Sequence, residues 1–291
     1  MNVDQYFSRI KYSGSPKRDF ATLSEIHYQH LLHIPYENVD VQLGRPLDFD
    51  IQSIFKKLVT NHRGGWCYEM NGLLGWALEQ VGFEVTRMSG AVNRASLGDE
   101  QLGNHLVLKV ILDRAYIVDV GLGDGLRHPI PLIEGSYDQS FLRYRLELRP
   151  DGYWRFHNHP FSNVDSFDFK DEIADEELLM DKCIWLQSSE DSLFKRFLIA
   201  QKFTPSSITV QIGKIFSVVT KDGKQTEIIE SPERMNSHMF ETFGVSEDFH
   251  SLWPKIEVAH ENLVNAENQK VDALDSPSVR GGTTRERSTP P

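Results

Sequence analysis

The sequence is poor in cysteine, in positive charge and in long apolar runs, and each shortage excludes a class of protein. Two of its 291 residues are cysteine, Cys67 and Cys183, which excludes a disulfide-stapled fold and fits a reducing compartment. The sequence has 31 Lys and Arg residues and 42 Asp and Glu residues, which gives a net charge of −11. This negative charge argues against non-specific nucleic-acid binding. No apolar run approaches the roughly 20 residues that span a bilayer, and the N-terminal segment lacks the apolar stretch of a signal peptide. We therefore predict a cytoplasmic protein that binds neither nucleic acid nor membrane.

The hydrophobic pattern divides the chain into a helical part, a β-rich part and a mixed part. With 40% apolar and 25% charged residues, the composition is that of an ordinary globular protein. Residues 1–83 carry apolar side chains at helical spacing and predict a helical bundle, whereas residues 84–187 change to the alternating, β-branched pattern of strands. Residues 188–262 mix both patterns, and the polar residues 263–291 predict a disordered tail.

Two local signals predict particular helices. Thr22-Leu23-Ser24-Glu25 has the form of a capping box and predicts that a helix begins there and ends at Pro35. The acidic stretch 171–177 predicts the solvated face of a helix rather than a metal site. We predict no metal site in the chain.

The best-defined helix follows a pair of glycines and begins near Cys67. Apolar residues recur at helical spacing from Met70 to Val81, and Gly82 supplies the stop. Cys67 therefore lies at or just before the first turn, where free N–H groups and the helix dipole favour an anion. A thiol in this place favours the nucleophilic thiolate. The alternative interpretation of Cys67 is a small buried apolar side chain.

A nucleophilic cysteine needs a base, and the base needs a group that orients it. His105 opens a strand predicted at 105–112, and Asp119 lies in a strand predicted at 115–120. An odd number of turn residues would place both side chains on one face of this hairpin, whereas a two-residue turn would place them on opposite faces. A carboxylate in an apolar strand is costly unless it is paired, so an imidazolium is the natural partner of Asp119. The alternative for His105 is an exposed histidine at the start of a strand.

Three alternating glycines follow Asp119, at Gly121, Gly123 and Gly125. They allow a ligand to approach the backbone closely and can form an anion-binding nest. The segment is not a dinucleotide-binding fingerprint, because the GxGxxG pattern is incomplete. Taken alone, it is equally consistent with a simple loop.

Five segments, in order along the chain, resemble the arylamine N-acetyltransferase family. They are Ile34-Pro35-Tyr36-Glu37-Asn38-Val39-Asp40, Arg63-Gly64-Gly65-Trp66-Cys67-Tyr68-Glu69-Met70-Asn71-Gly72, Asn104-His105-Leu106, Tyr116-Ile117-Val118-Asp119-Val120-Gly121-Leu122-Gly123 and Phe203-Thr204-Pro205. The Arg-Gly-Gly-x-Cys and Asp-Val-Gly-x-Gly segments are together highly specific. The likeness extends from the N-terminus to about residue 250.

This resemblance implies an α+β fold of three domains around a Cys-His-Asp core like that of thiol proteases. They would be an N-terminal helical bundle (1–83), a central β-barrel (84–187) and a C-terminal α/β lid (188–262). It also implies an acyltransferase of xenobiotic metabolism. Such an enzyme moves an acetyl group from acetyl-CoA, through a cysteine thioester, to arylamines, arylhydrazines or N-arylhydroxylamines in a ping-pong reaction. Acetyl-CoA and CoA are then co-substrates, no cofactor is tightly bound, and the partners are small molecules.

The resemblance also assigns residues by position. Cys67 would be the nucleophile, His105 its base and Asp119 the orienting carboxylate. The residues assigned to the coenzyme are Gly121, Gly123, Asp124, Gly125 and Phe203, those assigned to the acceptor are Tyr36 and Leu122, and further candidates for the coenzyme phosphates are Lys214 and Lys221. Leu122 stands where many members carry Phe, which leaves the acceptor preference open. The strand segment Met88-Ser89-Gly90-Ala91-Val92 also departs from the family's commoner form.

Two other functions are compatible with the triad alone. One is a different thiol acyltransferase or hydrolase, such as a transglutaminase-like enzyme or a peptidase. The other is a ligand-binding relative without activity. The length of the resemblance beyond the triad disfavours the first, and the presence of all three triad residues disfavours the second.

Overall fold

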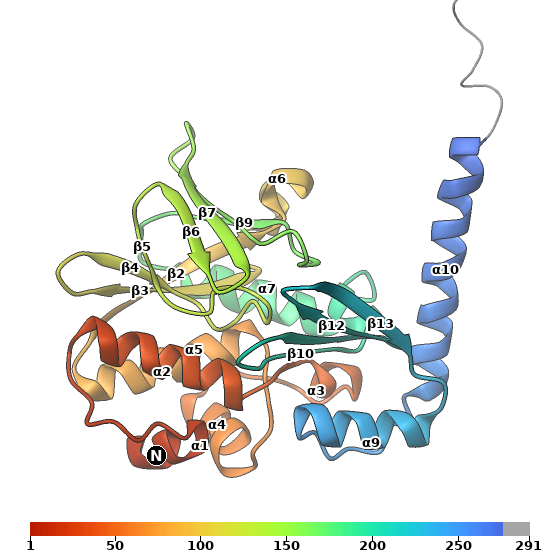
Figure 1. Ribbon diagram of the computed structural model, residues 1–291, viewed down its shortest axis with the longest axis horizontal. Helices are drawn as coiled ribbons and strands as arrows, with labels where there is room; N and C mark the ends of the chain where they lie inside the picture. Colours follow the sequence, from red (N-terminus) through yellow and green to blue (C-terminus); the bar gives the residue numbers. More distant parts are fainter. Residues whose placement is uncertain (276–291) are drawn as a thin grey trace, which may run out of the picture.

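Two antiparallel sheets and a set of helices make up the molecule (Figure 1). A computed structural model describes residues 1–275. The helices and turns are α1 (Val3–Ile10), α2 (Phe20–His33), α3 (Val39–Gln42), α4 (Ile51–Phe55), the π-helical turn η1 (Lys56–Thr60), α5 (Cys67–Val81), α6 (Arg94–Leu97), the 3₁₀ turn η2 (Asp99–Gln101), α7 (Glu176–Ser188), α8 (Leu193–Arg196), α9 (Pro232–Phe243) and α10 (Trp253–Asp275). The strands are β1 (Tyr36–Glu37), β2 (Glu84–Val92), β3 (His105–Ile111), β4 (Ala115–Val118), β5 (Ile130–Pro131), β6 (Gly135–Gln139), β7 (Leu142–Leu148), β8 (Trp154–His157), β9 (Ser166–Phe169), β10 (Ile199–Phe203), β11 (Ile208–Ile212), β12 (Ile215–Thr220) and β13 (Gly223–Ile228).

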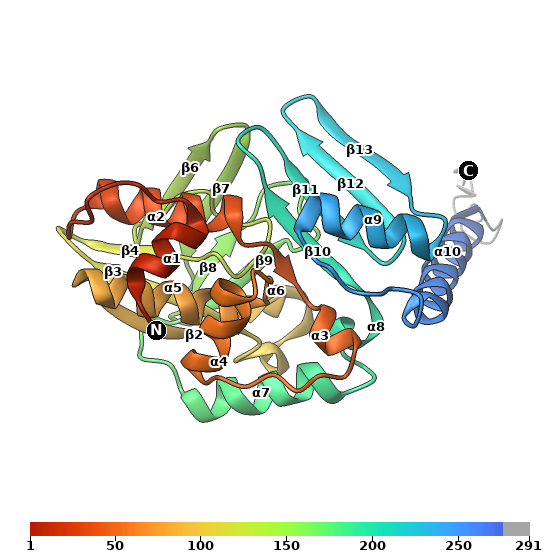
Figure 2. The same cartoon turned by 90° about the horizontal axis from the view of Figure 1, so that it is seen from below.

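The larger sheet is strongly curved and has eight strands in the order β5-β4-β3-β2-β9-β8-β7-β6. Helix α5 packs against β2 and β3, on the side of the sheet that faces the N-terminal helices (Figures 1 and 2). Gly75 of α5 lies against Leu108 of β3, and an added Cβ there would be in ordinary van der Waals contact at 3.5 Å. The sheet therefore fixes the axis of the helix that begins at Cys67.

The smaller sheet joins distant parts of the chain. Its order is β1-β10-β11-β12-β13, and β1 pairs with β10 through Tyr36 opposite Gln201. Strand β1 also contacts the glycine pair that precedes α5, because Glu37 N–H donates to the Gly65 carbonyl over 2.9 Å. Helix α9 covers one face of this sheet (Figure 2). The C-terminal sheet thus reaches the start of α5 through β1.

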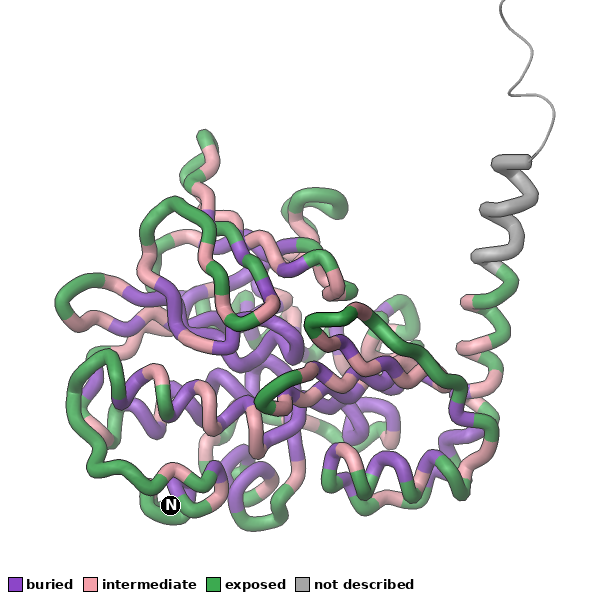
Figure 3. The backbone as a smooth tube through the Cα atoms, in the orientation of Figure 1, coloured by how far each residue is buried: buried purple, intermediate pink, exposed green. Residues whose placement is uncertain are grey.

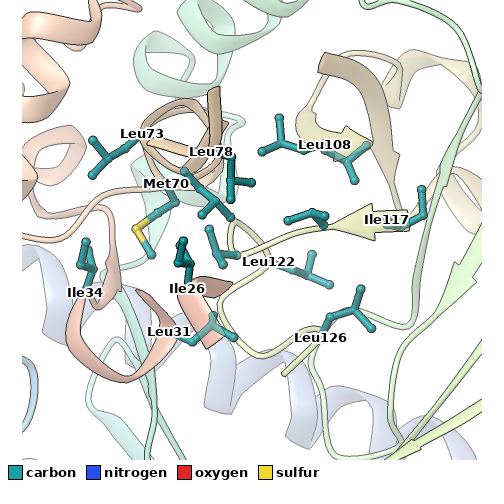
Figure 4. Packing of buried hydrophobic residues seen from close by; sticks show 14 of the residues in the cluster. Ile26, Leu31, Ile34, Met70, Leu73, Leu78, Leu108, Ile117, Leu122 and Leu126 are labelled. Atoms are coloured by element: carbon teal, nitrogen blue, oxygen red, sulfur yellow. The ribbon is translucent and has the colours of Figure 1, made fainter. Parts of the chain in front are cut away.

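The main core lies where α2, α5 and the curved sheet meet (Figure 3). Ile26 and Leu31 of α2 pack with Met70 of α5 and with Leu122, which follows β4 (Figure 4). Leu122 is 7% exposed, and it both belongs to this core and faces the cavity described below. Burial of such aliphatic side chains supplies the main favourable free energy of folding.

The capping box predicted at Thr22–Glu25 is wrong. Helix α2 begins at Phe20, and Asp19 is its N-cap, with the side chain accepting a hydrogen bond from Thr22 N–H. The Thr22 hydroxyl instead accepts from the backbone N–H of Lys17. Asp19 is an equally good capping residue three positions earlier, and the two signals overlap in the sequence.

The acidic stretch 171–177 is helical only at its end. Helix α7 begins at Glu176, and the Asp175 side chain caps it by accepting from the N–H groups of Glu177 and Leu178. The residues of the stretch before Asp175 form bends and irregular backbone. Acidic residues here mark a helix N-terminus, where they interact favourably with the dipole, and not the face of a longer helix.

The disordered tail predicted from residue 263 is also wrong for its first part, because helix α10 continues to Asp275. Residues 276–291 lie outside the described part of the chain. Helix α10 stands away from the rest of the molecule in Figure 1, and the buried apolar side chains described in it, Trp253 and Ile256, lie in its first turns. A helix with one short apolar patch gives a weak periodic signal.

We propose the three-domain division 1–83, 84–187 and 188–262 for the described chain. It is supported by the curved sheet, whose strands all fall between Glu84 and Phe169, and by the smaller sheet, which takes four of its five strands from residues 199–228. Within residues 1–275, no helix has the length and apolar character needed to cross a membrane.

Candidate active site

Cys67 is the first residue of α5, as the glycine pair predicts. The chain enters the helix through a tight passage, since an added Cβ on Gly64 would lie 2.2 Å from the Pro35 carbonyl oxygen. The Glu69 carboxylate then accepts a hydrogen bond from Trp66 N–H over 3.3 Å, which caps the first turn. Cys67 is 3% exposed and lines a cavity. Its thiol is therefore held at a helix N-terminus beside a space that can receive a ligand.

The hairpin of β3 and β4 brings His105 and Asp119 together. Ile111 pairs with Ala115, so the turn has the three residues 112–114, the odd number that places both side chains on one face. His105 Nε2 lies 2.9 Å from Asp119 Oδ2, and both side chains are 2% exposed. Because Nε2 is occupied by Asp119, Nδ1 of the ring is left for the thiol of Cys67.

The charged forms of His105 and Asp119 stabilise each other. Burial lowers the pKa of His105, but the Asp119 carboxylate and the Cys67 sulfur outweigh burial and raise that pKa to about 10. Burial raises the pKa of Asp119, yet His105, Asn71 and the Gly121 N–H together bring it below its ordinary value. At neutral pH the histidine is thus an imidazolium and the aspartate a carboxylate, which is the pairing that stabilises a thiolate.

Asn71 completes the cluster, and sequence reasoning did not single it out. It lies one helical turn after Cys67, and its Nδ2 donates to Asp119 Oδ1 over 2.7 Å and to the Leu106 carbonyl over 2.6 Å. Its Oδ1 accepts from Val120 N–H over 2.9 Å. The i, i+4 spacing from Cys67 is the only signal for this role in the sequence.

His27 of α2 holds the loop that follows Asp119. Its Nδ1 donates to the Arg127 carbonyl oxygen over 3.1 Å, and its Nε2 accepts from the Asp119 N–H over 3.4 Å. Burial is the largest effect on the ring and lowers the pKa of His27 to about 4, so the side chain is neutral. His27 therefore bridges both ends of the glycine-containing loop 119–127, another role that sequence reasoning missed.

Gly121 brings this loop against the nucleophile. An added Cβ would lie 2.6 Å from Asn71 Nδ2 and 2.8 Å from Cys67 Cα, so no other residue fits without displacement. Its N–H donates to Asp119 Oδ1 over 2.8 Å. The requirement for glycine at this position is close approach rather than a special backbone angle.

A cavity of about 360 Å³ opens beside Cys67. Five of the residues predicted for the site line it: Tyr36, Cys67, His105, Gly121 and Leu122. Asp119 lies behind His105. A second cavity, of about 190 Å³, is lined by Phe49, Trp76 and their neighbours and contains none of the predicted site residues.

The remaining residues predicted for the coenzyme are packed outside the lining of this cavity. Asp124 is buried and accepts from Ser162 Oγ over 3.0 Å, and burial raises its pKa to about 6. Gly123 lies against the Gln201 side chain, Gly125 accepts from the Tyr144 hydroxyl, and Phe203 is 1% exposed.

The two lysines considered for the coenzyme phosphates are engaged elsewhere. Lys214 Nζ lies 3.4 Å from Glu230 and 5.3 Å from the centre of the Trp253 ring. Lys221 is exposed and pairs with Asp222 over 2.7 Å. Neither lysine lines the cavity at Cys67.

A buried thiol, an imidazole and a carboxylate in this order form the arrangement that activates a nucleophile for acyl transfer. Cys183, the other thiol, has no such neighbours. It is 2% exposed, and burial raises its pKa. The chemistry of the site therefore points to Cys67 as the group that attacks.

Comparison with known proteins agrees with this geometry. A family model described as N-acetyltransferase matches residues 19–251. A pineal gland isozyme of arylamine N-acetyltransferase from Gallus gallus is 31% identical over 278 residues, covering 85% of this chain and 95% of the relative. The arylamine N-acetyltransferase of Mycolicibacterium smegmatis is 44% identical over 147 residues, which cover 48% of this chain and 54% of the relative.

Solved structures give the same result. An M. smegmatis arylamine N-acetyltransferase structure is 30% identical, with a TM-score of 0.79 over 88% of this chain and 97% of its own. The Mycobacterium marinum enzyme, solved in complex with CoA, shares the fold at 24% identity, with a TM-score of 0.81 over 89% of this chain and 99% of its own. The chain therefore belongs to the arylamine N-acetyltransferase family.

Proposed function

We propose that this enzyme transfers the acetyl group of acetyl-CoA to arylamines through a thioester on Cys67, with His105 as base and Asp119 as the orienting carboxylate. The activity is that of the family. The residue roles rest on one observation above all, the hydrogen bond between His105 Nε2 and Asp119 Oδ2 beside a buried thiol at the start of α5. Arylhydrazines and N-arylhydroxylamines are acceptors of the same reactive class.

In the first half-reaction the Cys67 thiolate attacks the acetyl carbonyl carbon of acetyl-CoA. The carbonyl oxygen gains negative charge, which the N-terminal turn of α5 stabilises through its free N–H groups and its dipole. The bond from the acetyl carbon to the CoA sulfur then breaks. The imidazolium of His105 gives its proton to the departing sulfur, so CoA leaves as a thiol and acetyl-Cys67 remains.

In the second half-reaction the arylamine nitrogen attacks the carbonyl carbon of acetyl-Cys67. Neutral His105 accepts a proton from this nitrogen, the carbon–sulfur bond of the thioester breaks, and the N-acetylated product leaves. The Cys67 thiolate and the His105 imidazolium are restored as a pair. Asp119 keeps the ring oriented and stabilises its positive form in each half-reaction.

The loop 121–125 is proposed to receive the coenzyme and Tyr36 and Leu122 to contact the acceptor. Tyr36, Gly121 and Leu122 are supported by their place in the cavity wall beside Cys67. The family resemblance supports the assignment of Gly123, Asp124, Gly125 and Phe203 to the coenzyme site. These residues lie outside the lining of the cavity, and each would contribute to the coenzyme site by shaping it. We also propose that the enzyme acts in the cytoplasm on small molecules alone, which its two free thiols and its negative charge favour.

The test is turnover of acetyl-CoA with a panel of anilines and arylhydrazines, followed as N-acetylated product. Wild type and Cys183→Ala should be active, whereas Cys67→Ala should be folded and inactive, because only Cys67 adjoins His105. A Cys67→Ala enzyme that retains most of its turnover would refute the proposed nucleophile. Wild-type enzyme that releases CoA only to water would favour a hydrolase instead.

A further inference from the structure

The wall of the cavity beside Cys67 contains few charged side chains. Within residues 1–275, the lining includes no lysine or arginine, and Asp191 is its only carboxylate. The other polar side chains in the wall are mostly neutral amides: Asn93, Gln101, Asn104, Asn163 and Gln201. The imidazolium of His105 is already paired with Asp119. An anionic ligand would therefore find no free positive side chain in this described wall.

Asp191 is exposed and belongs to the short connection between α7 and α8, so it lies at the mouth of the cavity. Among the described residues, its carboxylate forms no ion pair. The adjacent Glu190 is 3.8 Å from Lys195, and Lys182 bonds to the Glu100 carbonyl while its ammonium lies 5.2 Å from the Trp185 ring centre. Lys195 and Lys182 are thus engaged outside the lining.

Three exposed apolar side chains also lie at the mouth. Leu97, Trp185 and Leu193 line the cavity and yet are 57%, 45% and 54% exposed. Such side chains offer contact area to the flat face of an aromatic ring. A carboxylate on that ring would lose water in this place without gaining a cationic partner, which is costly, and it would meet the negative charge of Asp191.

We propose that Asp191 is a specificity-determining residue that makes the acceptor site favour neutral and cationic arylamines over anionic ones. This inference rests on the proposed function, and it names the acceptor class for the same site. Discrimination arises from rejection of the wrong charge as well as attraction of the right one. Because Asp191 is exposed, solvent and salt weaken its effect.

The test uses three acceptors of nearly equal size: 4-aminobenzamidine, a cation, 4-aminobenzamide, which is neutral, and 4-aminobenzoate, an anion. Full-length enzyme is first acetylated with acetyl-CoA and freed of CoA, and the rate of deacetylation by each amine is then measured. Substituents also change the reactivity of the amine, so the quantity compared is the cation-to-anion rate ratio of each variant relative to wild type. This double ratio cancels the intrinsic reactivity of the acceptors.

Asp191→Asn should lower the cation-to-anion ratio by about twofold to fivefold, the range for an exposed charge pair, and added salt should shrink the difference from wild type. Glu190→Gln, a matched loss of a neighbouring carboxylate, should leave the ratio unchanged. An equal ratio in Asp191→Asn and wild type, with acetylation intact, would overturn the inference alone. Failure of acetyl-CoA to acetylate wild type would instead overturn the proposed function.

Discussion

Three neighbours hydrogen-bond to the Asp119 carboxylate and hold it in place. Its carboxylate receives hydrogen bonds from His105, Asn71 and the Gly121 N–H. Asp119→Asn places an amide donor against at least one of these donors and removes the charge that stabilises the imidazolium. We expect enzyme acetylation to slow by about 10²-fold or more.

The measurement is the single-turnover rate of acetylation, with circular dichroism to confirm folding. Asp113→Asn is the matched control, because Asp113 lies in the turn of the same hairpin and bonds there to Arg114 and to the Tyr116 hydroxyl, not to the His105 cluster. Near-normal acetylation by a folded Asp119→Asn enzyme would mean that this carboxylate is merely structural.

The charge of His105 predicts how stability depends on pH. Its pKa in the folded enzyme is about 10, above the ordinary value of 6.5, so folding favours the protonated ring. The resulting stability is fully present below pH 6.5 and is lost as pH rises through about 10. The difference in unfolding free energy between wild type and His105→Asn should therefore narrow from pH 7 to pH 10. Denaturant titrations across this range are the check, and a constant difference would contradict the ion pair.

Sequence alone could suggest the three residues of the proposed triad but not the groups that hold them. Cys67, His105 and Asp119 stand in segments with local signals: a helix start, a strand start and a charge in an apolar strand. Asn71 and His27 act largely on backbone groups of β3 and of the loop after β4. Those partners are set by packing between distant elements, so the sequence offers only the i, i+4 spacing of Asn71 from Cys67 and no signal for His27.

At the scale of elements, helix α2 should stabilise the loop 119–127 through His27. His27→Leu removes the hydrogen-bonding partner of the Arg127 carbonyl and of the Asp119 N–H, and each buried group left without a partner costs about 1–3 kcal/mol. We expect lower stability and faster amide hydrogen exchange within the loop.

His30→Leu is the control for this effect. His30 is equally buried on α2, but its ring bonds to the Tyr6 hydroxyl and not to the loop. Both variants should lose stability, whereas only His27→Leu should accelerate exchange in residues 119–127. Equal exchange in the two variants would show that His27 does not hold the loop.

Elements with strong periodic patterns were predictable, and short or paired ones were not. The ends of α5 follow the prediction, and the turn that joins β3 to β4 has the odd number of residues that the functional interpretation of His105 and Asp119 requires. Strand β1 has two residues and exists because β10 pairs with it, which no local pattern shows. The N-cap of α2 was misplaced because Asp19 and Thr22 both have capping side chains.

At the scale of the whole molecule, a network of charges ties the C-terminal part to the start of α5. Glu247 accepts from Arg63 over 2.8 Å and from Arg45 over 2.6 Å, and Arg63 also pairs with buried Glu37. Lys57 of the π-helical turn forms ion pairs with both Asp40 and Glu69, and Glu69 caps α5. The C-terminal residues therefore connect to the catalytic helix through charged side chains.

Glu247→Gln should destabilise the enzyme by about 1–3 kcal/mol, the range for hydrogen bonds to charged groups, and the loss should be smaller at high salt. Glu241→Gln, a change at an exposed position of α9, should be neutral. Urea unfolding at two salt concentrations measures both effects. A Glu247→Gln enzyme as stable as wild type would show that the network contributes nothing across this contact.

The overall organisation followed from the resemblance more than from composition. A mixed pattern predicted α+β, but the curvature of the eight-stranded sheet and its strand order depend on long-range pairing, such as β2 with β9. Helix α10 was missed because its described apolar contacts are confined to its first turns. Local patterns therefore predict elements, and tertiary contacts decide how far those elements extend.

In the proposed mechanism every acetyl group passes through Cys67. Mass mapping of the enzyme after exposure to acetyl-CoA without acceptor observes this step directly. We predict one acetyl group per chain, on the peptide that contains Cys67, with Cys183 unmodified. Addition of an arylamine should remove this group and yield an equal amount of N-acetylated product. Transfer to the amine with no acetyl group on Cys67 at any time, or with the group on another residue, would contradict the account.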